Sequence, residues 1–360
     1  MRDESPGAPA GGTGTDGRIV VVGGYGAVGR IVAQTLGKWC PGRVVVAGRS
    51  LERARALTAL APTAALLAEA VDIDRAAGIE RMLRGTRVVV MCVERNNETL
   101  ARACLQRGIG YVDVSATASV LESIGRLDAL AVAHGATAAL SVGLAPGLTN
   151  VLARYCVDRL PSARAVDLAV LLGTAGDHGP DSVRWTVERL GEPVRPAPGT
   201  PSRAVAALPD LGRRTVHWFP FSDQSTLTAT LGVPVTTRIC FDSRAVTAVA
   251  FGLRAAGFFA ALCRLGATPL RTRALSRLGT GTDRFAVQAT AIGPDGERVC
   301  GAVTGRQECR ATGIVTAQVA RRVYLGRTPA GVRHIDQFVD AEAFLNELPT
   351  RHLALHLARR

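Results

Sequence analysis

A glycine-rich segment near the start of the chain restricts the fold more than any other feature. Four apolar residues, Ile19 to Val22, precede it, and an apolar pattern with helical spacing follows from Val28 to Leu36. Between them, Gly24, Gly26 and Gly29 have the G-x-G-x-x-G spacing. This pattern allows a tight turn, a close approach of pyrophosphate to the backbone, and close packing of helix on strand. The alternative is a glycine turn without a ligand.

The strand–loop–helix context favours the ligand-binding interpretation, because the helix start offers free N–H groups and a positive dipole end to phosphates. We therefore expect a dinucleotide cofactor to bind the whole loop. The loop residues are Gly24, Tyr25, Gly26, Ala27, Val28 and Gly29.

Composition indicates a globular protein with two domains. The chain has 360 residues, of which 47% are hydrophobic and 20% charged. Its net charge of +13 does not predict nucleic-acid binding, because Lys38 is the only lysine, the arginines are scattered and aromatic residues make up 4%. An anionic cofactor or substrate accounts for part of this charge.

The eight cysteines show no C-x-x-C pair and no zinc-type spacing. We expect reduced thiols, a cytoplasmic location and no metal site. The first 17 residues are rich in glycine, proline and alanine and lack an apolar core, which favours a flexible tail over a signal peptide.

Apolar strand patterns alternate with helical ones as far as residue 148, which predicts a doubly wound parallel sheet of the Rossmann type. We expect six strands, the last near residue 142. Their ranges are 19–22, 43–50, 70–74, 87–93, 110–115 and 137–142.

The second strand ends in Gly48, Arg49 and Ser50, where an NAD-specific site would carry an Asp or Glu for the ribose 2′-hydroxyl. A guanidinium and a hydroxyl favour a 2′-phosphate, and hence NADP(H). A solvated arginine is the alternative. We expect the later strand ends to contact the cofactor as well, through Asp72 and Ile73 at the adenine and through Cys92, Val93 and Ser115 on the nicotinamide side.

Residues 149–312 predict an α+β substrate and dimerisation domain with a mixed, mostly antiparallel sheet. Its expected strands are 165–172, 236–242, 284–292 and 298–307, with a hairpin at 293–296 and a surface loop over 192–211. In residues 313–360 we expect helices that return to the first domain.

Residues 245–263 are almost all apolar, with Arg254 at the middle. An arginine in the centre of a membrane span costs roughly 2.5–3.5 kcal/mol, and alanine and glycine offset little of it. The stretch therefore favours a buried or interface helix over membrane association, with weak peripheral lipid contact as the alternative.

Several motifs in order resemble the saccharopine dehydrogenase-like reductases. They are the glycine loop, Gly48-Arg-Ser50, Tyr111-Val-Asp-Val-Ser115 and Gly143-Leu-Ala-Pro-Gly-Leu-Thr-Asn150, with a further likeness at His178 to Trp185 and at Thr316-Ala317. The resemblance implies an NAD(P)-binding Rossmann domain, a mixed-sheet substrate domain and a homodimer. It also implies reduction of a carbon–nitrogen double bond. Ala145 stands where amino-acid-forming members carry an aspartate, so the substrate does not carry over.

Hydride transfer needs a positioned nicotinamide and a proton source. Because Lys38 is the only lysine, catalytic-lysine mechanisms are nearly excluded. We expect His178, on a loop after a strand, and Asp113 to be the catalytic candidates, against structural roles for both. Arg184, Trp185 and Asn150 are the substrate-binding candidates, with a helix-surface role as the alternative for Arg184 and core packing as the alternative for Trp185.

Together these features predict an NADP(H)-dependent oxidoreductase acting on an imine or carbonyl of an amino-acid-like substrate in specialised biosynthesis. One alternative is an enoyl or keto reductase for a lipid-type substrate. Another is a non-catalytic NADP-binding regulator. The expected partner is a small molecule, with no nucleic acid and no membrane.

Overall fold

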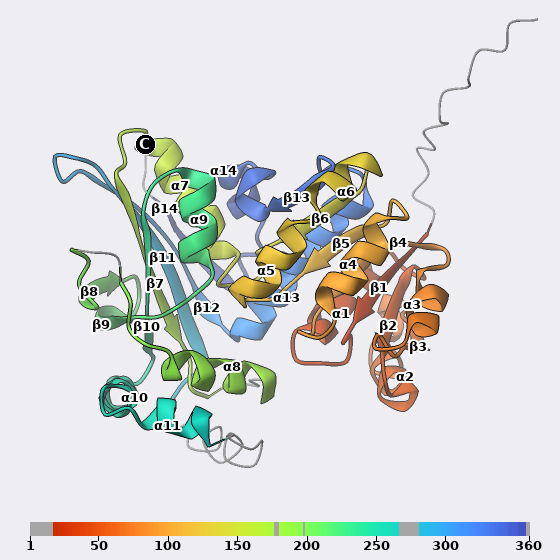
Figure 1. Ribbon diagram of the computed structural model, residues 1–360, viewed down its shortest axis with the longest axis horizontal. Coiled ribbons are helices and arrows are strands. Elements are labelled where there is room, and N and C mark those ends of the chain that lie inside the picture. The colour runs from red at the N-terminus through yellow and green to blue at the C-terminus, as the bar shows by residue number, and fades with distance from the viewer. Residues whose placement is uncertain (1–16, 176–179, 197–198, 266–280, 358–360) are drawn as a thin grey trace, which may run out of the picture.

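The computed structural model describes residues 17–175, 180–196, 199–265 and 281–357. Two seven-stranded sheets organise this part of the chain, the first on the right of Figure 1 and the second on the left. The predicted α/β class, a parallel doubly wound sheet joined to a mixed sheet, is confirmed.

All strands of the first sheet are parallel, in the order β13-β6-β5-β4-β1-β2-β3. The order reverses at β1, which lies between β2 and β4, and a sheet of this kind binds ligands in the crevice beyond the carboxyl ends of those strands. The strands are β1 (Arg18–Val22), β2 (Val44–Gly48), β3 (Leu67–Ala70), β4 (Thr86–Met91), β5 (Gly110–Asp113), β6 (Thr137–Leu140) and β13 (Gly331–His334).

Helices cover both faces of this sheet, which is why its central strands are continuously apolar. The apolar residues of one face form a cluster with α1 (Gly29–Trp39), α2 (Leu51–Ala59) and α13 (Glu308–Tyr324). Those of the other face form a cluster with α3 (Ala76–Leu83), α4 (Asn97–Leu105), α5 (Ala118–Gly125) and α6 (Asp128–Ala133).

Three details of the first sheet differ from expectation. The sheet has a seventh strand, β13, that comes from far along the chain. The third strand ends at Ala70, so Asp72 and Ile73 follow it instead of lying on it. This strand is at the edge of the sheet and partly exposed, and its Leu-Ala-Glu-Ala sequence gives little apolar signal. The helical pattern of residues 124–134, which predicts one helix before the sixth strand, is divided between two helices, α5 and α6.

The second sheet has the order β14-β12-β11-β7-β10-β9-β8. β7 and β10 are parallel and every other pair is antiparallel. Its strands are β7 (Ala165–Leu172), β8 (Arg203–Leu208), β9 (Gly212–Trp218), β10 (Val235–Phe241), β11 (Arg284–Ile292), β12 (Arg298–Arg306) and β14 (Leu353–Leu357). Its helices are α7 (Leu148–Arg159), α8 (Pro180–Gly191), α9 (Asp223–Leu231), α10 (Arg244–Ala255), α11 (Phe258–Arg264) and α14 (Ala341–Asn346).

Both edges of the second sheet depart from expectation. β8 falls inside the segment predicted as a surface loop, and β9 follows it to form a hairpin. At the other edge β14 pairs with β12, where helices were expected. These edge strands are short or rich in alanine and arginine, so they lack the continuous apolar runs of the central strands.

The stretch 245–263 is not one buried helix. It forms α10 and α11, which meet at Gly257 with φ +75° and bend by 64° relative to one another. Among the described residues, no single helix is long and apolar enough to cross a membrane, although this bent pair together has the required length and composition.

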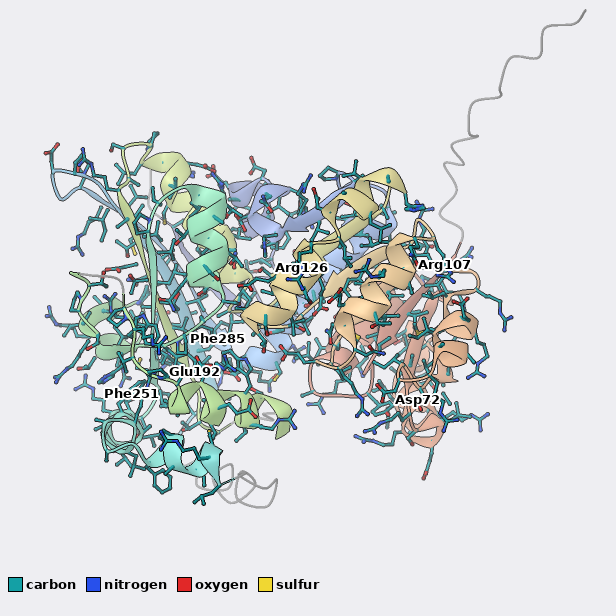
Figure 2. The ribbon with its side chains drawn as sticks, viewed as in Figure 1. Asp72, Arg107, Arg126, Glu192, Phe251 and Phe285 are labelled. Carbon is teal, nitrogen blue, oxygen red and sulfur yellow. The ribbon has the colours of Figure 1, made fainter. Side chains whose placement is uncertain are left out.

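One apolar core joins the two parts of the molecule. α7 packs on β11 and β12, and α13 packs on α1 and on β4 and β5. Residues of both sheets, such as Val21 and Phe285, belong to the same buried cluster. The labelled side chains of Figure 2 illustrate the arrangement, with Asp72 and Arg107 on the first sheet's part and Phe251 and Glu192 on the second's.

Candidate functional site

The glycine loop has the geometry that phosphate binding requires. It runs from the end of β1 to the start of α1. A Cβ atom on Gly24 would lie 2.7 Å from the carbonyl oxygen of Val21, and one on Gly29 would collide with that of Gly23. A Cβ atom on Gly26 would meet only one atom, the Gly23 oxygen at 3.1 Å, so the outer side of the loop is open there. In dinucleotide-binding loops with this spacing, the second glycine is the place where the pyrophosphate approaches the backbone.

Tyr25 connects this loop to the end of β2. Its ring packs against Gly48, and its hydroxyl accepts a 3.2 Å hydrogen bond from the backbone N–H of Ser50. The guanidinium of Arg53 lies 4.5 Å from the centre of the same ring. Ser50 in turn caps α2, because its hydroxyl oxygen accepts from the Arg53 N–H at 3.2 Å.

Arg49 is exposed next to this capped helix start. Arg53 therefore brings a second guanidinium to the position predicted for a 2′-phosphate. Sequence reasoning missed Arg53, although a serine N-cap at Ser50 places it in the first turn of the following helix, near Arg49.

Asp72 and Ile73 lie in the turn after β3. Asp72 accepts from the Asp74 N–H at 3.1 Å and pairs with Arg75 at 3.3 Å. Ile73 is buried, and its carbonyl oxygen accepts from the Asn96 amide at 2.6 Å. Contact of these residues with adenine stays a prediction.

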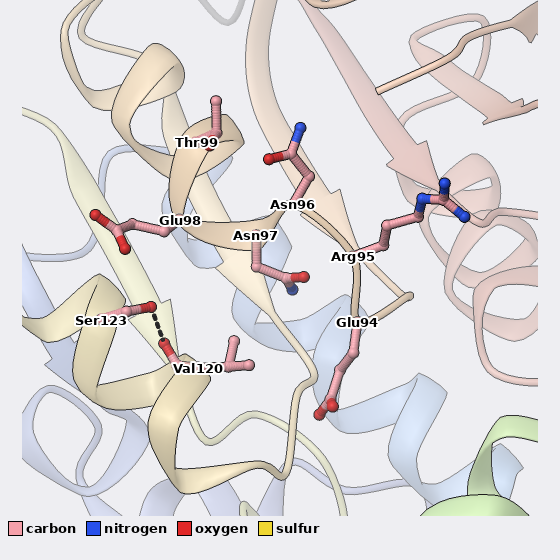
Figure 3. A pocket seen from close by; sticks show the side chains of 8 residues that line it. All are labelled: Glu94, Arg95, Asn96, Asn97, Glu98, Thr99, Val120 and Ser123. Atoms are coloured by element: carbon pink, nitrogen blue, oxygen red, sulfur yellow. Dashed lines mark hydrogen bonds between the residues drawn. The ribbon is translucent and has the colours of Figure 1, made fainter. Parts of the chain in front are cut away.

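The end of β4 lies directly against the glycine loop, since a Cβ on Gly23 would be 2.6 Å from Val93. Burial raises the pKa of the neighbouring Cys92 thiol, which is therefore protonated at neutral pH. Figure 3 shows the residues that follow, with Glu94 and Arg95 directed away from each other. Glu94 accepts three hydrogen bonds from the start of α5, and Arg95 pairs with Asp74 at 2.5 Å.

Asp113, at the end of β5, is fully buried in a closed hydrogen-bond network. One carboxylate oxygen accepts from the Asn97 amide at 2.8 Å and the Tyr111 hydroxyl at 2.7 Å, and the other from the Ser115 N–H at 2.8 Å. Burial raises the pKa of Asp113, and these bonds oppose that shift. The network gives Asp113 a positioning role in the loop that carries Ser115, and its direct catalytic role stays a prediction.

The segment between β6 and α7 is also closed. Asn150 is fully buried, its oxygen accepts from the Gly147 N–H at 2.9 Å, and its amide donates to Asp336 at 3.2 Å. The same segment contains the cis peptide bond between Ala145 and Pro146. Asn150 thus stabilises the loop itself, and substrate contact by this residue stays a prediction.

Ser141 and His334 form a pair that sequence reasoning missed. They follow β6 and end β13, two neighbouring strands, and the serine hydroxyl lies 2.8 Å from Nδ1 of His334. Burial lowers the pKa of His334, and nearby Asp336 opposes that shift. The two residues are 193 positions apart, and only the place of β13 in the sheet brings them together.

A cavity of about 330 Å³ lies where the glycine loop meets the second sheet. On one side it is lined by Ala27 and by Arg30 of α1. On the other side it is lined by Gly173, Asp283 and Arg310. Gly173 follows β7, Asp283 precedes β11, and Arg310 lies in the first turn of α13. It therefore adjoins the expected phosphate site and carries side chains of both charges.

Comparison with known proteins agrees with this arrangement. Residues 19–139 match the saccharopine dehydrogenase NADP binding domain. The first domain belongs to that family. No curated protein matches the chain.

One solved structure has the same overall fold at low sequence identity, and a second one is less similar. Apo saccharopine dehydrogenase (L-Glu forming) from Saccharomyces cerevisiae is 13% identical with a TM-score of 0.62, and the match covers 95% of this chain and 100% of that one. A probable dehydrogenase from Thermotoga maritima is 11% identical with a TM-score of 0.45, covering 91% and 93%. The chain thus combines a saccharopine dehydrogenase-type NADP-binding domain with the overall fold of that enzyme, and its cofactor is a nicotinamide dinucleotide.

The remaining predicted residues belong to the second part of this saccharopine dehydrogenase-like fold. His178 lies outside the described residues. Arg184 is exposed on α8 and lies 3.9 Å from Glu188. Trp185 packs between Phe219 and Phe221, with ring centres 5.8 and 5.5 Å away.

The indole N–H of Trp185 is buried and has no hydrogen-bond partner within the described ranges. Trp185 thus packs in an aromatic cluster with Phe219 and Phe221, and substrate contact by this residue stays a prediction. Within the same ranges, no group of three or more His, Cys, Asp or Glu side chains is placed to hold a metal ion.

Proposed function

We propose that the protein is an NADP(H)-dependent oxidoreductase that reduces an imine or carbonyl on an amino-acid-like substrate. The observation that carries this proposal is the cavity between the glycine loop and the second sheet. It adjoins the expected phosphate site, so a molecule in it lies next to the bound cofactor.

The residues of the first domain fit an NADP(H) cofactor. The loop from Gly24 to Gly29 would hold the pyrophosphate at the open Gly26 position, and Arg49 and Arg53 would hold the 2′-phosphate. When bound, NADPH supplies the hydride.

The charges of the cavity support an amino-acid-like substrate. Arg30 and Arg310 are suited to a carboxylate, and Glu308 to an ammonium or a protonated imine. The Asp283 carboxylate is already paired with Arg306 at 2.7 Å. Gln307 has φ +62° and donates from its N–H to the Asp283 carbonyl at 2.7 Å, which fixes the turn into α13 that carries Arg310. A lipid-type substrate would favour an apolar lining instead.

The proton for the reduced atom needs a donor near this cavity. We retain His178 as the candidate, with a water molecule as the alternative. We expect His178→Ala to lower kcat while the NADPH dissociation constant stays the same. Full activity of this variant would remove His178 from the mechanism.

The deciding experiment measures NADPH oxidation by the purified protein with paired keto acids and amines, and with aldehydes. Turnover with one of these classes supports the proposal, and Arg310→Ala should then raise KM for acidic substrates more than it lowers kcat. Arg327→Ala, on the loop after α13, is a matched control outside the cavity. NADPH binding without turnover on any substrate would favour the non-catalytic regulator. The homodimer and the cytoplasmic location remain expectations of the same proposal.

A further inference from the structure

Between Arg244 and Arg264, the outer surface of α10 and α11 is apolar. Eleven residues between Ala245 and Cys263 are exposed, and every one is Ala, Gly, Val, Leu, Phe or Cys. The largest are Val249, Leu253 and Phe258, with exposed fractions of 61%, 37% and 46%. A helix at the surface of a globular protein normally has charged residues on the face away from the core. Folding of this chain alone therefore does not explain why the outer face of α10 and α11 is apolar.

The opposite face explains why this surface stays outside. Phe251 stacks on His217 of β9, with ring centres 4.0 Å apart and planes at 9°. Arg254 donates to the Trp218 carbonyl oxygen at 2.7 Å and to that of Glu192 at 3.1 Å. These contacts fix the rotation of α10, so Val249 and Leu253 cannot turn inward without breaking them.

Charged side chains border this surface at both ends. The exposed residues Arg244 and Arg264 bracket it. Near Cys263, the carboxylates of Glu188 and Glu192 and the guanidinium of Arg189 also lie close by, so cations border the ends of the face while the side next to α8 carries both signs. An apolar helix face bordered by cations is typical of a helix that lies in the interface of an anionic bilayer.

We propose that the elbow formed by α10 and α11 binds the surface of an anionic lipid membrane. The elbow lies at the lower left edge of the molecule, below the second sheet (Figure 1). The exposed side chains are mostly Ala and Gly with one Phe, whereas protein interfaces concentrate aromatic residues and methionine at their centre. This composition favours lipid over a protein partner. The proposal is independent of the catalytic one.

Vesicle flotation with the full-length protein tests the proposal. We expect it to bind vesicles of phosphatidylcholine with phosphatidylglycerol, and to bind pure phosphatidylcholine at least about tenfold more weakly, since arginines contribute to the attraction. Val249→Asp should lower binding to the anionic vesicles about tenfold or more. Val132→Asp on α6, at a valine that is 52% exposed, makes the same change elsewhere and should have no effect.

A gain of binding gives a second, independent test. A side chain on Gly252 would meet no atom within 4 Å, and this residue lies between Val249 and Leu253 on the exposed face. Gly252→Leu should therefore strengthen vesicle binding, and Gly252→Asp should weaken it. Thermal melting and NADPH titration verify that each variant is folded.

The proposal is overturned if the wild-type protein does not bind anionic vesicles, or if Val249→Asp and Val132→Asp reduce binding equally. Equal binding to both kinds of vesicle would overturn the role of the arginines. Analytical sedimentation, which measures the oligomeric state, tests whether a second copy of the chain binds this face instead. If the protein forms a dimer that Val249→Asp dissociates, and no vesicle binding occurs, then a second copy of the chain covers this face.

Discussion

The carboxyl edge of the first sheet has two halves that are built in different ways. Over β1 and β2, the site is local, because the residues from Gly24 to Arg53 are close in sequence and the loop is open at Gly26. Over β5, β6 and β13, buried contacts join distant segments, such as Asn150 to Asp336 across 186 positions. The comparison indicates that a short segment is enough to form the local half, whereas the distant half depends on the completed fold.

The largest expected effect is in the local half. We expect Gly26→Val to weaken NADPH binding by about a thousandfold or more, because the side chain fills the open side of the loop. Fluorescence titration measures the binding, and thermal melting should show a folded protein. Gly125→Val at the end of α5 changes the same residue type in an open place, and NADPH should bind this control normally. Unchanged affinity in Gly26→Val would mean that the loop does not hold the cofactor.

Asp223 extends the comparison to the second sheet, where a buried carboxylate supports α9. It is fully buried, and Thr237 donates to one oxygen at 2.7 Å while the other oxygen is buried without a partner in the described part of the chain. Burial raises the pKa of Asp223 to about 6. The folded protein therefore holds this proton at a pH where the unfolded chain has released it, so this group lowers stability as pH rises from about 4 to about 6.

We expect Asp223→Asn to remove this pH-dependent loss of stability. Relative to the wild type, its free energy of unfolding should rise by about 3 kcal/mol between pH 4 and pH 7. Urea unfolding at a series of pH values provides the measurement, with Asp295→Asn in the exposed β11–β12 turn as control. A parallel pH dependence of wild type and variant would show that Asp223 does not titrate in this range.

A smaller effect is expected at Asn150 in the distant half of the edge. Asn150→Ala removes two hydrogen bonds and leaves the Gly147 N–H buried, which should cost about 2 kcal/mol of stability. NADPH affinity should change little, since the residue supports the loop after β6 and not the glycine loop. Asn346→Ala on the exposed end of α14 is the control. A stable variant with lost substrate turnover would instead restore Asn150 as a substrate-binding residue.

The smallest expected effect concerns the choice between NADPH and NADH. Arg49→Ala and Arg53→Ala should each lower the preference for NADPH about tenfold, because each removes one cation from the 2′-phosphate. NADH affinity should stay the same. Arg55→Ala on the same helix is exposed and serves as the matched control. Equal NADPH and NADH affinities in the wild type would make these arginines ordinary surface charges.

The sequence was informative where structure depends on short segments. The central strands β1, β2 and β4 were predicted because each is a run of buried β-branched residues between turn signals. The loop residues Gly24, Gly26 and Gly29 were identified from their spacing and from their place between a strand and a helix. Their geometry agrees with the role that the pattern suggested.

The rest depended on contacts that no local pattern contains. The pairing of β13 with β6, and with it the Ser141–His334 contact, requires knowledge of which strand completes the sheet. The edge strands β8 and β14 are short, and most of their residues are exposed or half-buried, so no continuous buried run distinguishes them from loops. The burial of Asp113 and Asn150 likewise follows from tertiary packing and not from their residue type.

The place of β13 also bears on how the chain is made. A ribosome releases β1 to β6 first, but β13 ends at His334, after nearly all of the second sheet has been synthesised. Until then the outer edge of β6 has no strand to pair with, and α13 is not yet available to cover the sheet. The cofactor-binding half of the protein therefore begins folding early and is completed late. A chain that stops before residue 308 should expose apolar surface and aggregate instead of forming an independent nucleotide-binding domain.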